Sequence, residues 1–196
     1  MYESLDNLIN GFGGNWSTVT LNPSDKSANI TLSGGDLVAT ATNTAYKSVR
    51  GTHGHSTGKR QFEVTITTRI SYVLVGIGTS GADINNYLGY DYLGHGLRHD
   101  SLKFNTARDV AYNPGYVQGN IIGVCVDFDI GTLQFYKNGV PMDNTFNICF
   151  MIGSVKFYPM LTIYANNDVL TANFGATSFS YPVTGYIAWN IGFRGI

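Results

Sequence analysis

Four histidines fall in two closely spaced pairs, a spacing at which imidazole side chains can share a metal ion. The pairs are His53 with His55 and His95 with His99. Further Cys, Asp or Glu ligands usually complete such a site, and no cluster of these residues flanks either pair closely. We therefore expect solvated histidines in loops and no resident metal ion.

Carboxylates suited to acid–base chemistry are scarce. Hydrolysis of a glycosidic bond needs two acidic residues flanking that bond, and the only glutamates are Glu3 and Glu63. Glu63 alternates with the apolar residues Phe62 and Val64, so it faces away from their side of the strand. The motifs G-x-S-x-G and H-E-x-x-H are absent from the sequence. A triad of distant residues stays open, since its members need only meet in space, but the expectation is a protein that is not an enzyme.

Gly76, Gly78 and Gly81 match the pattern G-x-G-x-x-G. In dinucleotide-binding proteins this pattern opens a helix whose N-terminus points at the phosphates. Here the segment ADINNYLGYD follows, and its composition is typical of a loop. We expect these glycines to end a strand, and we expect no cofactor.

Tyrosines gather between residues 87 and 116, together with histidine and arginine. Tyr and Arg often carry binding energy, because they bury a large area with little loss of rotamer freedom and keep a polar tip. The candidate binding residues are Tyr87, Tyr92, His95, Arg98, His99, Tyr112 and Tyr116. The alternative is that several of these side chains pack on the edge of the fold or inside its loops.

The candidate residues lie in an irregular stretch, Thr79 to Gln118, which we interpret as long loops with brief strands. The regular segments on both sides predict an all-β fold. Residues 61–70 alternate apolar and polar side chains, and residues 121–128 are apolar on both faces, as in a central strand of a two-layer sandwich. Turns are predicted at Ser33–Asp36 and at Asn138–Gly139. The chain should form one antiparallel two-sheet β-sandwich.

The composition excludes several classes of function. A net charge of -1 with 13% charged residues argues against nucleic-acid binding, which needs clustered Lys and Arg. No apolar run is long enough to span a membrane, and the first residues lack the features of a signal peptide. Cys125 lies in an apolar run and is expected to be a reduced core thiol, although a disulfide with Cys149 stays open.

Several segments resemble, in their order, the SPRY domain family. They are GKRQFEV, VGIG, YLGYD, GNIIGVCVDFDIGTLQFYKNG, FYPMLTI and ANFG. The resemblance covers Gly58 to Tyr186, and Asn120 stands where the family usually has Asp. The flanking segments LNPSDKS, ITLSGGDLVATAT, SVRGTHGHSTGK and GYIAWN are similar to SPRY-containing bacteriophage tail, fibre or virion-surface proteins.

The resemblance implies a sandwich related to the concanavalin A-like jelly roll, with a binding surface built by loops at one edge. It implies that Asp127 and Asp129 serve a turn between two strands rather than a calcium site. It also makes Tyr90 part of a core motif and places Tyr92, His95 and Arg98 just beyond that motif, among the binding loops.

We therefore expect residues 17–196 to form a single SPRY-like domain, preceded by an arm of residues 1–16 that could serve for attachment. The expected function is a non-catalytic binding module of a virion, which contacts other virion proteins or a host surface receptor and is assembled in multiple copies. The alternatives are a cytoplasmic SPRY adaptor that binds a peptide, and a carbohydrate-binding lectin module.

Overall fold

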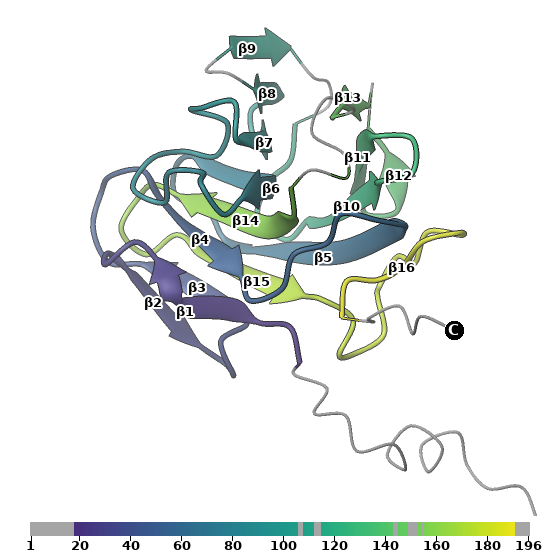
Figure 1. Cartoon of the computed structure of the whole chain (residues 1–196). Helices are drawn as coiled ribbons and strands as arrows, with labels where there is room; N and C mark the ends of the chain where they lie inside the picture. Colours follow the sequence, from purple (N-terminus) through teal and green to yellow (C-terminus); the bar gives the residue numbers. More distant parts are fainter. Residues whose placement is uncertain are drawn as a thin grey trace, which may run out of the picture.

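The computed structural model describes residues 18–105, 108–111, 115–142, 145–148, 153 and 155–190. All regular elements in these residues are β-strands, arranged in two sheets that pack face to face (Figure 1). The predicted all-β sandwich is thus confirmed. The arm of residues 1–16, Tyr112 and Cys149 lie outside the described residues. Within the described ranges the search for a membrane-crossing helix finds none.

One sheet has seven strands, in the order β1-β4-β14-β6-β7-β8-β9, and we call it the seven-stranded sheet. All its neighbouring strands are antiparallel. In this order the strands are β1 (Leu21–Lys26), β4 (Lys47–Gly51), β14 (Phe157–Ile163), β6 (Val73–Thr79), β7 (Gly94–Arg98), β8 (Leu102–Asn105) and β9 (Arg108–Ala111).

The second sheet has nine strands, and we call it the nine-stranded sheet. Its main path is β12 (Val140–Pro141), β11 (Thr132–Lys137), β10 (Ile121–Asp127), β5 (Lys59–Thr68), β15 (Val169–Asn173), β3 (Val38–Ala41) and β2 (Ile30–Ser33). Off this path, β13 (Phe146–Asn147) pairs with β11, and β16 (Ile187–Ala188) runs parallel to the start of β5.

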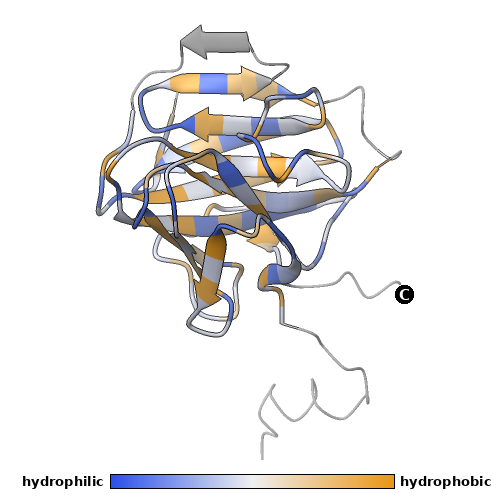
Figure 2. Ribbon diagram, turned by 90° about the vertical axis from the view of Figure 1, so that its left-hand side faces the viewer, coloured by the Kyte–Doolittle hydropathy of each residue, from blue (hydrophilic) through white to orange (hydrophobic). Residues whose placement is uncertain are grey.

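The core lies between the two sheets because apolar side chains alternate along the strands that face each other. Phe62, Val64 and Ile66 of β5 are fully buried there, opposite Val73 and Val75 of β6. Figure 2 shows hydrophilic and hydrophobic residues alternating along several strands. The predicted inward face of β5 is confirmed.

The predicted turns are also confirmed. Gly34, Gly35 and Asp36 all have positive φ in the β2–β3 hairpin, and so do Asn138 and Gly139 between β11 and β12. These conformations suit Gly and Asn, whose side chains meet little steric opposition there.

Carboxylates close the turn between β10 and β11, as the resemblance implies. Oδ1 of Asp127 accepts hydrogen bonds from the backbone N–H groups of Asp129 and Ile130, and its Oδ2 lies 2.9 Å from Nζ of Lys59. Oδ1 of Asp129 accepts the N–H of Gly58. Both aspartates therefore join the turn to the start of β5.

The irregular stretch contains more sheet than its composition predicts. Strands β7, β8 and β9 form within it and extend the seven-stranded sheet beyond β6, as the upper part of Figure 1 shows. Glycines occupy two of the five positions of β7, so the period-two apolar signal of a strand is weak there. Among the described residues of this stretch, the longest segment without strand is 80–93, which we call the crossing loop.

Residues 175–190, which we call the C-terminal segment, cover the outer face of the nine-stranded sheet near β5. The carboxylate of the buried Glu63 accepts the N–H groups of Ser180 and Tyr181, at 2.9 and 2.7 Å. The predicted outward orientation of Glu63 is confirmed. Trp189 then enters the core against Phe62 and is fully buried.

Candidate functional site

Five tyrosines form a connected aromatic surface on the seven-stranded sheet, and we call it the tyrosine platform. Its rings belong to Tyr46, Tyr72, Tyr87, Tyr90 and Tyr164. Neighbouring ring centroids lie 4.7–6.2 Å apart in tilted or edge-on pairs, which are the favoured aromatic geometries. Because the rings already touch, they leave no cage between them, and the platform is a packed surface.

Strand ends bring three of these tyrosines together. Tyr46 precedes β4, Tyr72 precedes β6, and Tyr164 follows β14. In the antiparallel register the last residue of β14 pairs with the first residue of each neighbour, Lys47 on one side and Val73 on the other. The three rings therefore emerge at the same end of the sandwich.

The crossing loop supplies Tyr87 and Tyr90, and Leu88 fixes it to the outer face of the sheet. Leu88 is buried against glycines of β6 and β7. A Cβ atom at Gly94 would lie 2.7 Å from Cδ1 of Leu88, and one at Gly96 would lie 2.9 Å from its Cγ. Gly76 and Gly78, two of the glycines predicted to end a strand, lie within β6, and a Cβ atom at either would also approach Leu88, at 3.0 and 3.6 Å.

Two buried hydroxyl groups complete the attachment of the crossing loop. Oγ of Ser48 donates to the carbonyl oxygen of Asn86 at 2.7 Å, and the N–H of Leu88 donates to Oγ1 of Thr162 at 2.9 Å. The two hydroxyls are also 2.7 Å from each other. The backbone polar groups of the loop are paired here away from water, which holds the loop in one position.

Arg98 lies between aromatic rings beside the platform. Its Cζ is 4.7 Å from the ring centroid of Tyr72 and 4.9 Å from that of Phe104. Asp100 accepts two hydrogen bonds from the guanidinium, from Nε at 2.7 Å and from Nη2 at 2.9 Å. The positive charge of Arg98 is therefore compensated within the chain, and its position is fixed.

The electrostatics of the platform follow from this pair. Burial acts to raise the pKa of Asp100, but the hydrogen bond and charge of Arg98 outweigh burial and lower it. Burial raises the pKa of Tyr46, with Arg98 opposing the shift. The phenol of Tyr46 thus lies next to a compensated ion pair.

Two predicted binding residues are not at the surface, and we correct them. His95 is fully buried, because alternation along β7 turns it inward while Gly94 and Gly96 face outward. Its ring lies 6.0 Å from those of Phe146 and Phe157, and burial lowers its pKa to about 4. Tyr116 is also buried, with its hydroxyl 2.8 Å from the carbonyl oxygen of Leu97.

The other predicted residues that the structure describes are Tyr87, Tyr92, Arg98 and His99, and all but Tyr92 contact rings of the platform. Tyr87 belongs to it, and Arg98 adjoins it. His99 is half-buried behind Tyr72, with ring centroids 5.7 Å apart. Tyr92 is 63% exposed on the crossing loop. Tyr90, which the resemblance assigns to the core, is instead half exposed and stacks edge-on against Tyr87.

Sequence reasoning missed Tyr46, Tyr72 and Tyr164. Each stands beside the end of a strand in the structure and lies outside the tyrosine-rich window of residues 87–116. A signal was present, because the register of three adjacent antiparallel strands places such flanking residues at one end of the sheet. That register was not available without the order of the strands.

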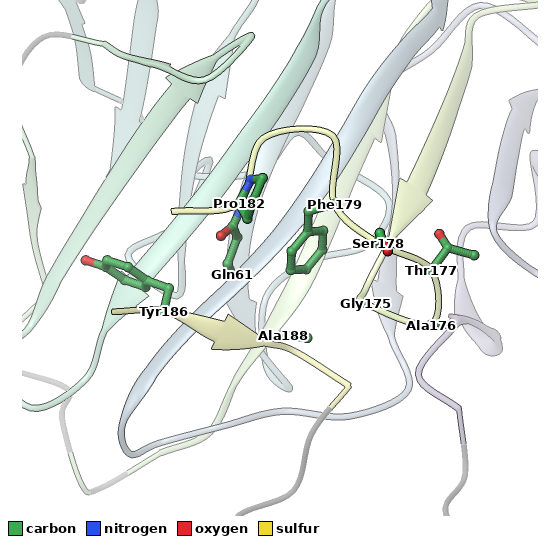
Figure 3. A pocket seen from close by; sticks show the side chains of 9 residues that line it. All are labelled: Gln61, Gly175, Ala176, Thr177, Ser178, Phe179, Pro182, Tyr186 and Ala188. Carbon is green, nitrogen blue, oxygen red and sulfur yellow. The ribbon is translucent and has the colours of Figure 1, made fainter. Parts of the chain in front are cut away.

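A recess lies on the outer face of the nine-stranded sheet, with a volume of about 410 Å³. Figure 3 shows its lining, which comes from β5 and the C-terminal segment: Gln61, Gly175, Ala176, Thr177, Ser178, Phe179, Pro182, Tyr186 and Ala188. The amide of Gln61 is already used, since it accepts the N–H of Val183 and donates to the carbonyl of Tyr181. The lining has no charged side chain, and burial raises the pKa of Tyr186 to about 12.

In the described ranges, His, Cys, Asp and Glu side chains do not gather in groups of three or more that could hold a metal ion. Cys125 is a free, buried cysteine, and burial raises the pKa of its thiol. The tyrosine platform is therefore the most developed candidate site among the described residues.

Comparison with known protein families decides the relationship of the chain. The family model described as SPRY domain matches residues 59–177. The chain belongs to the SPRY domain family. The two solved structures compared here share its fold: the SPRY domain of human HERC1, with a TM-score of 0.68 and 14% identity, and the TRIM65 PSpry domain, with 0.66 and 17%. The HERC1 match covers 81% of this chain and 99% of that one, and the TRIM65 match covers 80% and 92%.

Among curated proteins, the chain is similar to Ran-binding protein 9 of Xenopus laevis, with 30% identity over 176 residues. This match covers 84% of the chain but only 31% of the relative, so the SPRY chain spans about a third of that protein. The relatives named here are eukaryotic, and they give no support to the predicted similarity to phage tail or virion-surface proteins. The family resemblance is confirmed, and its finer phage assignment is not supported.

Proposed function

We propose that this SPRY chain is a non-catalytic protein-binding module that binds a short segment of a partner protein on the tyrosine platform. The observation that carries the proposal is the platform itself: five tyrosine rings in mutual contact, two of them substantially exposed, on a rigid sheet. Rigid aromatic side chains contribute large contact area at low entropic cost, which is typical of binding hot spots.

The charges around the platform indicate which segments it would favour. Arg98 is compensated by Asp100, and Lys47 and Asp168 are fully buried beneath the platform. Exposed apolar side chains follow at the same end of the sandwich, Ile70 at 60% and Val117 at 56%. A segment with uncharged apolar or amide side chains matches this surface, since it brings no uncompensated charge into the interface.

The similarity to eukaryotic proteins supports an adaptor inside the cell, the alternative reading of the sequence, over a component of a virion. The partner is then a protein of the same cell. The carbohydrate-binding alternative stays a prediction, and a glycan array probed with the same protein distinguishes it from peptide binding.

The test is selection of peptides from a random display library on the wild-type chain. Peptides enriched on the wild type should bind much more weakly to a Tyr72→Ala/Tyr164→Ala variant, because removing the two rings removes contact area from the centre of the platform. Tyr181→Ala is the matched control, since Tyr181 is 38% exposed, as Tyr72 is, but lies on the C-terminal segment.

Chemical-shift mapping of a selected peptide should then mark the ends of β4, β6 and β14. Enrichment of peptides that bind the wild type and the platform variant equally would place the binding surface elsewhere and overturn the proposal.

A further inference from the structure

The three chain segments that carry Tyr46, Tyr72 and Tyr164 meet at one buried residue, Asp168, whose carboxylate binds the segments of Tyr72 and Tyr164. This side chain is 0% exposed. Its Oδ1 accepts the N–H groups of Ile70 at 2.6 Å and Ser71 at 3.3 Å, directly before Tyr72. Its Oδ2 accepts the N–H groups of Ala165 at 2.7 Å and Tyr164 at 3.3 Å.

The backbone of the same residue binds the third segment. The carbonyl oxygen of Asp168 accepts the N–H of Ala41 at 3.0 Å, and the N–H of Asn167 donates to the carbonyl of Ala41 at 2.9 Å. Residues 41–46 leave β3 at this point and lead to Tyr46. Asp168 therefore contacts all three segments within one residue.

Lys47, which carries the opposite charge, binds two of these segments, those of Tyr46 and Tyr164. It is fully buried, and its Nζ donates to the carbonyl oxygens of Asn43 and Tyr164. The peptide groups flanking Tyr164 are thus held on both sides, the N–H by Asp168 and the carbonyl by Lys47. Burial lowers the pKa of Lys47, and the nearby charge of Asp168 opposes that shift.

We propose that Asp168 and Lys47 form a clamp that positions the tyrosine platform for its partner, so that both are positioning residues without touching the ligand. The inference rests on the proposed function. Buried charges are costly unless they are fully hydrogen-bonded. The side chains of Asp168 and Lys47 form their hydrogen bonds with backbone groups of the segments that carry the platform tyrosines. Loosening the clamp leaves the core between the sheets intact but lets three of the five rings move.

Asp168→Asn tests the clamp. In Asp168→Asn an amide nitrogen replaces one carboxylate oxygen. That nitrogen cannot accept hydrogen bonds from the two backbone N–H groups it faces, so one pair of hydrogen bonds is lost. If the competent arrangement of the rings falls to about a tenth of the population, the dissociation constant of a library-selected peptide rises about tenfold. Amide exchange should speed up at Ile70 and Ala165 and stay slow in β5 and β10.

Asp127→Asn is the matched control. Asp127 is also a buried carboxylate that accepts two backbone N–H groups, but it lies in the nine-stranded sheet. A comparable loss of stability with unchanged peptide affinity is expected there, which separates positioning from a general loss of stability. Lys47→Met provides a second test if Asp168→Asn does not fold, and it should weaken the same peptide.

The clamp proposal would be overturned if folded Asp168→Asn bound the selected peptide with wild-type affinity. The same holds for Lys47→Met when that variant is the one tested. Either result would leave the proposed function in place. Failure of the wild type to select any peptide that depends on Tyr72 and Tyr164 would overturn the proposed function itself. The two failures are therefore distinguishable in one set of measurements.

Discussion

The outer faces of the two sheets are both covered by irregular chain, but in different ways. On the nine-stranded sheet the C-terminal segment is held through its backbone, by Glu63 and Gln61 of β5, and ends with Trp189 in the core. On the seven-stranded sheet the crossing loop is held through the buried side chain of Leu88 and two hydroxyl groups.

This difference bears on why the connected aromatic surface lies on the seven-stranded sheet. A segment held through its backbone lies flat on the sheet and closes it. A loop held at one apolar side chain and two backbone groups can direct its remaining side chains outward. Here Tyr87 and Tyr90 join the rings from the strand ends. The seven-stranded sheet therefore carries the candidate site, and the nine-stranded sheet is closed for stability.

The largest effect is expected from opening the closed face. Trp189→Ala removes a fully buried indole and should cost about 4 kcal/mol of unfolding free energy. Urea unfolding followed by circular dichroism measures this loss. A variant as stable as the wild type would show that the C-terminal segment lies outside the cooperative fold, and the contrast between the two faces would disappear.

A smaller loss is expected from loosening the crossing loop. Leu88→Ala should cost about 3 kcal/mol and should also raise amide exchange in the crossing loop, because Leu88 is its apolar anchor. Ile130→Ala is the control, since Ile130 is 63% exposed in a turn of the other sheet. Equal stability of the two variants would mean that the glycine surface does not anchor the loop.

Acid should lower the stability of the protein through His95, which lies on the inward side of the seven-stranded sheet. Its pKa is lowered by burial from 6.5 to about 4, so the unfolded chain binds the proton more readily than the folded protein does. Stability therefore falls as the pH drops below 6.5, and the loss grows until about pH 4.

Between pH 6.5 and 5 the loss due to His95 should reach about 2 kcal/mol. Chemical unfolding at a series of pH values measures the slope. His95→Gln should flatten it, whereas His53→Gln, at an exposed histidine, should not. An unchanged slope in His95→Gln would assign the acid sensitivity to other groups.

The fold was largely predictable because local chemistry decides it. Alternation in β5, the apolar run of β10 and the Asn138–Gly139 turn each depend on neighbouring residues, and each is confirmed. The platform was only partly predictable, because it depends on strand order. Tyr46 and Tyr164 are more than a hundred positions apart in the sequence printed above, and only sheet pairing brings them within 4.7 Å between ring centroids.

The inward orientation of His95 could not be predicted from the sequence either. Its neighbours Gly94 and Gly96 carry no hydrophobic signal, so the alternation of β7 could not be followed in the sequence. The glycines that hide this pattern are also the ones that receive Leu88. The two glycines that make room for Leu88 therefore also remove the apolar alternation that would have shown the inward orientation of His95 in the sequence.

The N–H of Val19 donates to Oδ1 of Asn190 at 2.6 Å, so positions near the two limits of the described sandwich are side by side. Joining them by a short linker would close a loop at low entropic cost, and new termini could be opened at the exposed Asn138–Gly139 turn. A circular permutant of this kind should keep the tyrosine platform, which lies in the other sheet. The same proximity would let the sandwich be grafted into a loop of another protein as a single replaceable part.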